Sequence, residues 1–533
     1  MPPITDTTPK TVSPAELKSM LHDGAEIALL DIREAGQFGE SHLLFATPLP
    51  YSRLELDVFQ LLPRKSARVV ICDDGTLGIA AIAAARLKEL GYSDVAVLAG
   101  GTRAWAKAGY ALFRGVNVPS KTLGELVEHA CHTPRITAQE LARMQTAGED
   151  FVVLDGRPFG EYNKMNIPGG ICCPNAELPY RVATMVPNPA TRIVVNCAGR
   201  TRSIIGAQTL INFGVPNPVV ALENGTQGWY LADFKLEKQA GRRYPDSIDA
   251  ATLPSLQGSA QNLMKRFGIS EVTAAEVEAW LLDPSRTTYL CDVRTPEEFA
   301  KDAIPGSVHA PGGQLVQATD QWVAVRHARV VLIDGEGVRA PVAASWLVQL
   351  GYDVSVLADG VHSGLRPPPV AVIALPELPK ISAVALKQAL ESKRATAFDL
   401  NYSMSYRRAH VPGSRWSNRT KIIADVRKVT GPLVLIADDI GIAQLAAAQL
   451  AAAGKHDVKL LDGGIAAWSK AGYPAEASPE KPADEECIDH LFFVHDRHAG
   501  NREAMRQYLA WETGLLAQLD AQDLAEFRVR AVN

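Results

Sequence analysis

Cysteine is scarce in this chain, and its scarcity excludes a small fold held together by disulfides. Only 7 cysteines are spread irregularly over 533 residues, a usage that indicates a reducing compartment. No apolar run reaches membrane-spanning length, and the opening MPPITDTTPK lacks the basic and apolar regions of a leader peptide. The net charge of −5 is too small to predict nucleic acid or a membrane as a partner. The expected location is the cytoplasm.

The chain is too long for one hydrophobic core, and its motifs recur. An Asp-x-Arg, with an aromatic residue seven positions after the Asp, starts at Asp31, Asp155 and Asp292; Asp399 starts a weakened version with Asn401 in place of Arg. These starts are 124, 137 and 107 residues apart. A glycine suited to end a helix follows each start in step, at Gly91, Gly214, Gly351 and Gly454. The chain is therefore predicted to hold four copies of one domain.

Within each copy, continuous apolar strands alternate with helical stretches. This pattern predicts an α/β fold, in which a parallel sheet has helices on both faces. Ligands of such sheets bind at the carboxyl ends of the strands. The expected boundaries are 10–125, 126–240, 269–373 and 374–477 for the copies, 241–268 for a linker with one short helix, and 478–533 for a helical C-terminal extension.

One cysteine lies where a nucleophile is expected. In RIVVNCAGRTRSIIG, residues 192–206, an apolar strand runs into a loop at Cys197 and the loop runs into a helix. Backbone N–H groups at the helix start, together with Arg200 and Arg202, favour the thiolate over the thiol. Buried core cysteines rarely lie among Gly, Arg, Thr and Ser, so we interpret Cys197 as reactive.

These motifs resemble those of the rhodanese-like sulfurtransferases, over about nine tenths of the chain. CAGRTR, residues 197–202, matches the six-residue active-site loop of that family, and Asp155-Gly-Arg157 with a later IPGG matches its upstream signature. Asn224-Gly-x-x-x-Trp229 matches its closing motif, whereas Met165-Asn166 replaces the usual Gly-His. The resemblance implies that Cys197 is catalytic and that the rest of the site is formed by Ala198, Gly199, Arg200, Thr201, Arg202 and Ser203, supported by Asp155, Arg157 and Trp229.

The other copies lack this cysteine. Aligned on the strand before the loop, position 197 corresponds to Asp73, Asp334 and Asp438, which can cap a helix but cannot form a persulfide. Cys72 lies one residue too early, although a one-residue shift of the loop would make it reactive. One active copy and three degenerate ones are expected.

The expected chemistry is transfer of sulfane sulfur through a Cys197 persulfide. Thiosulfate donates the sulfur, sulfite leaves, and a thiol or cyanide accepts it. Arg200 and Arg202 are expected to attract the dianionic donor, which favours thiosulfate over a monoanionic keto acid. Arg157 is expected to be structural, and neither a metal nor a cofactor is expected.

Two other functions stay open. The degenerate copies could recruit a protein that accepts sulfur from Cys197, so that the chain is a persulfide carrier. A phosphatase or arsenate reductase is the less favoured alternative, because its C-x5-R loop needs an arginine where Ser203 stands. The sequence also leaves open a homo-oligomer and the role of the C-terminal extension.

Overall fold

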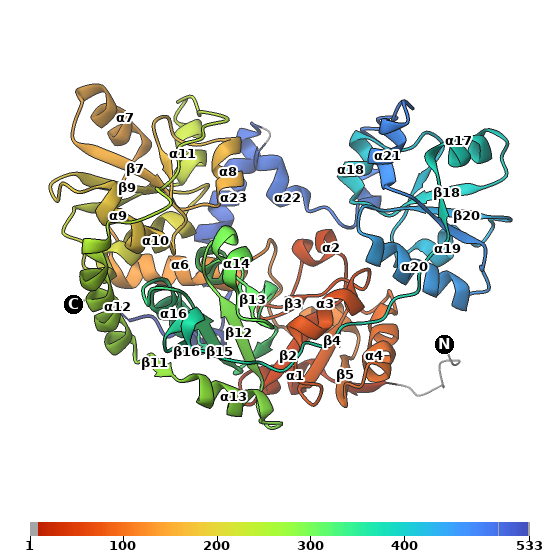
Figure 1. The fold of residues 1–533 in the computed structure, drawn as a ribbon, viewed down its shortest axis with the longest axis horizontal. Coiled ribbons are helices and arrows are strands. Elements are labelled where there is room, and N and C mark those ends of the chain that lie inside the picture. The colour runs from red at the N-terminus through yellow and green to blue at the C-terminus, as the bar shows by residue number, and fades with distance from the viewer. Residues whose placement is uncertain (1–8, 499, 531–533) are drawn as a thin grey trace.

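The computed structural model describes residues 9–498 and 500–530. It contains four sheets, each with the same strand order along the chain, and this confirms the predicted α/β architecture of four tandem copies (Figure 1). Part of the N-terminal stretch and the last three residues of the predicted extension lie outside the described residues. No helix in the described ranges has the length and apolar character that crossing a bilayer requires.

The first copy has a sheet in the order β1-β5-β4-β2-β14, with β3 beside β2. Its own strands are β1 (Lys10–Val12), β2 (Ile27–Asp31), β3 (Thr47–Pro48), β4 (Arg68–Cys72) and β5 (Asp94–Leu98). Its helices are α1 (Pro14–Leu21), α2 (Ala35–Glu40), α3 (Leu54–Leu61), α4 (Ile79–Glu89) and α5 (Gly101–Lys107). The helix α6 (Val118–Cys131) follows and leads into the second copy.

The second copy has a parallel sheet in the order β6-β10-β9-β7-β8. Its strands are β6 (Arg135–Ile136), β7 (Phe151–Asp155), β8 (Ile171–Cys172), β9 (Arg192–Asn196) and β10 (Val219–Leu222). Its helices are α7 (Ala138–Ala147), α8 (Phe159–Lys164), α9 (Leu178–Met185), α10 (Thr201–Phe213) and α11 (Gly225–Leu231).

The predicted linker contains a longer helix than its polar sequence indicates. The helix α12 (Leu253–Phe267) has 15 residues and buries Leu256, Ala260, Leu263 and Phe267. It packs on α16 (Arg339–Gln349) of the third copy and also touches α10. Apolar residues at helical spacing give it a buried face, so this segment is part of the core rather than a free connection.

The third copy repeats the order as β11-β16-β15-β12-β13. Its elements are β11 (Ser270–Val272), α13 (Ala274–Leu282), β12 (Thr288–Asp292), α14 (Pro296–Asp302), β13 (Val308–His309), α15 (Gly312–Gln317), β14 (Val325–Arg326), β15 (Arg329–Ile333), α16 and β16 (Asp353–Leu357). The short strand β14 leaves this copy and pairs antiparallel with β2. One sheet therefore joins the first and third copies.

The fourth copy has the order β17-β21-β20-β18-β19. Its strands are β17 (Lys380–Ile381), β18 (Thr396–Asp399), β19 (Arg415–Trp416), β20 (Leu433–Ile436) and β21 (Val458–Leu461). Its helices are α17 (Ala383–Glu391), α18 (Ser403–Arg408), α19 (Ile422–Asp425), α20 (Ile440–Ala452) and α21 (Gly464–Lys470).

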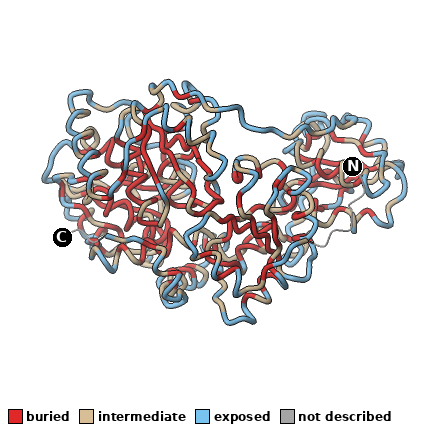
Figure 2. The backbone as a smooth tube through the Cα atoms, turned by 90° about the horizontal axis from the view of Figure 1, so that it is seen from below, coloured by how far each residue is buried: buried red, intermediate tan, exposed pale blue. Residues whose placement is uncertain are grey.

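The cores are shared unequally among the copies. Buried side chains of the first three copies, such as Leu30, Ile205 and Val330, belong to one continuous apolar cluster. The fourth copy has its own two clusters and forms a separate lobe (Figure 2). A buried ion pair between Arg419 and Glu55 attaches this lobe to the first copy.

The C-terminal extension returns from the fourth copy to the second. It contains α22 (Phe492–His495), a single helical turn at Asp496–His498, α23 (Arg502–Thr513) and α24 (Ala521–Ala525). Figure 1 shows α22 and α23 crossing from the fourth copy toward α8, and α23 packs against α6. The extension therefore lies beside the carboxyl ends of the strands of the second copy.

Candidate active site

Cys197 lies directly beyond the carboxyl end of β9. Asp155 of β7 is opposite Asn196 in the parallel ladder, so Cys197 is the first residue to leave the sheet. Only 2% of the residue is exposed. The Ser203 hydroxyl, in the first turn of α10, lies 3.1 Å from the Cys197 sulfur and donates to it. The thiol therefore faces the start of a 13-residue helix rather than solvent.

The loop after Cys197 rests on the start of α11. The Thr226 N–H donates to the Cys197 carbonyl at 2.8 Å, and the Gln227 N–H donates to the Ala198 carbonyl at 3.1 Å. The Gln227 side chain adds a second bond to the same carbonyl at 3.0 Å. Gly225 has a φ of +53°, and a side chain there would collide with the Cys197 carbonyl. The closing motif thus fixes the carbonyl side of the loop.

The amide side of the loop is open. Within the described ranges, the backbone N–H groups of residues 198–202 donate to no protein acceptor. These groups belong to the residues that follow Cys197 at the N-terminus of α10, where unpaired N–H groups and the helix dipole favour an anion. The loop therefore offers a ready set of donors for a negatively charged sulfur.

Both loop arginines are already paired with carboxylates. Arg200 donates to Glu125 of α6 at 2.7 and 2.9 Å and also pairs with Glu128. Arg202 donates to both oxygens of Glu161 of α8, at 2.8 and 2.7 Å. Burial raises the pKa of Glu161, but Arg202 outweighs burial and the pKa falls to about 2. Neither guanidinium is a free cation in this structure, and the expected binding of the donor by Arg200 and Arg202 stays a prediction.

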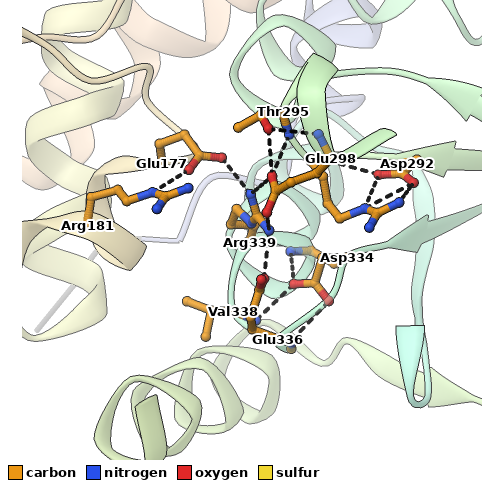
Figure 3. Close-up of polar contacts among 12 residues, drawn as sticks. Glu177, Arg181, Asp292, Thr295, Glu298, Asp334, Glu336, Val338 and Arg339 are labelled. Atoms are coloured by element: carbon orange, nitrogen blue, oxygen red, sulfur yellow. Dashed lines mark hydrogen bonds and ion pairs between the residues drawn. The ribbon is translucent and has the colours of Figure 1, made fainter. Parts of the chain in front are cut away.

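The third copy has an equivalent arginine–glutamate ion pair but no cysteine in its loop (Figure 3). Arg339, five residues after Asp334, pairs with Glu298 at 2.6 and 2.9 Å, as Arg202 pairs with Glu161. Because this pair persists in a loop that cannot carry sulfur, its common role is to hold the loop against the neighbouring helix. Arg339 also reaches Glu177 of the second copy at 3.1 Å and so ties the two copies together.

The degenerate loops hold their own anion in place of sulfur. Asp334 accepts from the N–H groups of Gly337, Val338 and Ala340 at 3.0, 2.9 and 2.9 Å. Asp73 accepts from Gly75 at 2.7 Å and from Ala80 at 3.1 Å in the first copy. These carboxylates satisfy helix-start donors of the kind that stay open around Cys197.

The fourth copy departs from the predicted alignment. Asp399 is opposite Ile436, as Asp155 is opposite Asn196, so Ala437 rather than Asp438 occupies the position of Cys197. The α20 cap is Asp439, which accepts from the Gly441 N–H at 2.9 Å. The assignment of Asp438 was wrong by one residue, because two adjacent aspartates after an apolar run do not define where the strand ends.

Arg157, which lines the cavity at Cys197, and Trp229 support the site through their hydrogen bonds. Arg157 donates to the two oxygens of Asp155 at 2.8 and 2.7 Å and to the Met165 carbonyl at 2.7 Å. Trp229 is buried in the core, and its indole N–H donates to the Lys235 carbonyl at 2.9 Å. Both side chains have structural roles.

Five other cysteines are poor nucleophiles. Burial raises the pKa of Cys172 and of Cys291 to about 12 and raises the pKa of Cys72, Cys173 and Cys487. Cys72 ends β4 at the position of Asn196, opposite Asp31, and its loop is not shifted. The described residues contain no group of three His, Cys, Asp or Glu side chains placed to hold a metal.

The C-terminal extension covers Cys197 and encloses a cavity of about 440 Å³. The cavity is bounded by the loop, α6, α15 and residues 494–512 of the extension. Lys121 of α6 donates to the Tyr508 hydroxyl at 2.6 Å and to Glu512 at 3.0 Å. Burial lowers the pKa of Lys121, but Glu512 and Tyr508 outweigh burial, so the pKa is raised and the amine stays charged. Sequence reasoning missed this contribution, since no motif in the extension signals it.

Comparison with known proteins identifies the fold family. The rhodanese-like domain profile matches residues 13–108, 137–232, 273–365 and 382–471. A crystal structure of a thiosulfate sulfurtransferase from Pseudomonas aeruginosa is 42% identical, with a TM-score of 0.90 over 98% of this chain and 99% of that one.

Curated relatives match one copy at a time. A thiosulfate sulfurtransferase, GlpE, from Pseudomonas fluorescens is 33% identical over 97 residues, which are 18% of this chain and 88% of the relative. A probable adenylyltransferase/sulfurtransferase, MoeZ, from Mycobacterium tuberculosis is 34% identical over 98 residues, which are 18% of this chain and 24% of the relative. The chain thus spans about a quarter of the length of MoeZ.

Proposed function

Because the chain belongs to the rhodanese-like family of sulfurtransferases, we propose that it moves sulfane sulfur from thiosulfate to a thiol or cyanide through a persulfide on Cys197. The observation that carries the proposal is the position of Cys197 at the edge of a cavity of about 440 Å³. Six Lys and Arg side chains and two carboxylates line this cavity. Its size and charge suit a small dianion.

The reaction needs two displacements at sulfur. The Cys197 thiolate attacks the outer sulfur of thiosulfate; a new S–S bond forms, and the old one breaks with its electron pair leaving on sulfite. The open N–H groups of residues 198–202 and the Ser203 hydroxyl are placed to stabilise the anionic outer sulfur of the persulfide. An acceptor thiolate or cyanide then takes this sulfur and releases the Cys197 thiolate.

The enclosure favours a small acceptor over a protein thiol. Cys197 is 2% exposed, and residues of the extension line the cavity next to its loop. A persulfide carrier that docks with a specific protein would need this extension to move away.

We also propose a cytoplasmic location, which is supported by seven free cysteines.

A phosphatase or arsenate reductase is not favoured by the loop. That chemistry requires a guanidinium six residues after the nucleophile, where Ser203 stands. Arg202, the residue before Ser203, has its guanidinium paired with Glu161.

Intact-protein mass spectrometry tests the proposal. Incubation with thiosulfate and no acceptor should add the mass of one sulfur atom per chain, and cyanide should remove it. C197S should lose the added mass and all sulfite release, whereas C72S, the matched control, should keep both. Sulfite release by C197S at the wild-type rate would refute the proposal.

Discharge of the persulfide-loaded protein by different acceptors distinguishes the enzyme function from the carrier function. Glutathione and cyanide should discharge the persulfide faster than the thiol of a small reduced protein does. Discharge by the protein thiol alone would instead support the carrier function.

A further inference from the structure

The C-terminal extension brings one arginine to the cavity that is not neutralised by a carboxylate. Arg497, in the turn between α22 and α23, lines the cavity together with Cys197 and is 9% exposed. Its Nε donates to the Val494 carbonyl at 2.9 Å, and its guanidinium stacks 3.6 Å from the centre of the Tyr508 ring. Within the described residues, its two terminal nitrogens have no hydrogen-bond or ion-pair partner.

The other buried cations of the cavity are already engaged. Arg200 and Arg202 pair with glutamates, and Arg157 pairs with Asp155. Lys121 is paired with Glu512. These pairs leave Arg497 as the buried cation without a carboxylate partner in the described part of the cavity lining. Its guanidinium carries five N–H groups and here spends one of them on Val494.

Stacking on Tyr508 also orders the Arg497 side chain before an anion binds. The Tyr508 face supports the guanidinium plane, so that little rotamer freedom remains to be lost on binding. The charge of Arg497 contributes to the lowered pKa of Glu161 and opposes the raised pKa of Lys121, which places it within electrostatic reach of both sides of the loop.

We propose that Arg497 is the residue that binds the sulfonate oxygens of the dianionic sulfur donor, so that the C-terminal extension completes the donor site of the second copy. This inference rests on the proposed function. The guanidinium offers two parallel N–H groups that match two sulfonate oxygens. The outer sulfur is left to face Cys197, and the same contact stabilises sulfite as the electron pair leaves with it.

Three substitutions in the full chain test the inference. R497Q should raise the KM for thiosulfate about tenfold or more, because it removes charged hydrogen bonds to the donor. R497K keeps the charge without the two-pronged geometry, so its KM should fall between those of R497Q and wild type. R506Q is the matched control, because it removes the same charge away from the cavity. Arg506 lies on α23, where it is exposed and paired with Glu503. The KM of R506Q should equal that of the wild type.

The donor's charge gives a second readout. An alkanethiosulfonate carries one negative charge rather than two, so R497Q should raise its KM less than it raises the KM for thiosulfate. If R497Q lowers the melting temperature too far for kinetics, R497K decides the matter alone.

Thiosulfate KM values in R497K and R497Q equal to that of R506Q would overturn the inference. Such a result would leave the proposed function standing, since the wild type would still take up sulfur. A wild type that takes up no sulfur from either donor would instead refute the proposed function, and the inference with it.

Discussion

Replacing Asp399 by Asn should stabilise the fourth copy, and the gain should increase with pH. Asp31, Asp155 and Asp292 each pair with the arginine two residues later, but Asp399 has Asn401 there. Asp399 is 1% exposed, and burial without that cation raises its pKa from 3.8 to about 7. Between these values the folded state holds the proton and the unfolded state releases it, so wild-type stability falls as pH rises through this window.

The size of the effect follows from the two pKa values. Asparagine has the shape of the protonated acid and does not ionise, so D399N avoids the cost of burying a charge. The free energy of unfolding of D399N should exceed that of the wild type by about 2 kcal/mol at pH 5 and by about 4 kcal/mol at pH 8. These values follow from about 1.4 kcal/mol for each pH unit between the unfolded and the folded pKa of Asp399.

Calorimetric unfolding of D399N and wild type at pH 5 and pH 8 measures this gain. D292N is the matched control, because Asp292 occupies the same position in the third copy but neutralises Arg294. It should destabilise the protein at both pH values by leaving a buried arginine unpaired. A D399N gain that is the same at pH 5 and pH 8 would refute the reasoning.

Three further substitutions or labels probe the site. G225A should slow sulfur loading and lower the melting temperature, because a side chain at that φ of +53° displaces the loop; G241A, in open space, is the control, and equal loading rates in the two variants would contradict this. R202Q should lower the free energy of unfolding in urea by about 1 to 3 kcal/mol, less than for a fully buried pair because Glu161 is half-exposed. A raised thiosulfate KM in R202Q with unchanged stability would show that Arg202 binds the donor after all. Iodoacetamide at neutral pH should leave Cys173 unmodified in the folded protein, since burial raises its pKa, and peptide mass mapping that finds it alkylated would argue against this.

The fold was predictable because its signals are local and repeated. The recurrence of Asp-x-Arg and of the glycine caps is present in the chain itself, and the structure confirms four α/β copies. The linker helix α12 was underestimated, because its buried face is apparent only once α16 lies against it. Asp438 was misplaced because an apolar run followed by two aspartates leaves the end of the strand ambiguous, and only the pairing of Asp399 with Ile436 resolves it.

The site was predictable only where it is contiguous in sequence. The loop from Cys197 to Ser203 and its floor at Thr226 could be located from motifs. The partners of its arginines could not, because Glu125 lies in another helix and pairing depends on distance in space. Arg497 follows Cys197 by 300 residues and carries no motif, so its approach to the loop depends on the packing of the extension.

The path of the extension has a consequence for the order in which the molecule is made. Chains begin to fold as they leave the ribosome, and the second copy is synthesised before α22 and α23 exist. Its loop is then open on the side that Tyr508 and Glu512 later cover. Until residues 494–512 have been made, the Cys197 thiol lacks the cover that they give it in the finished chain.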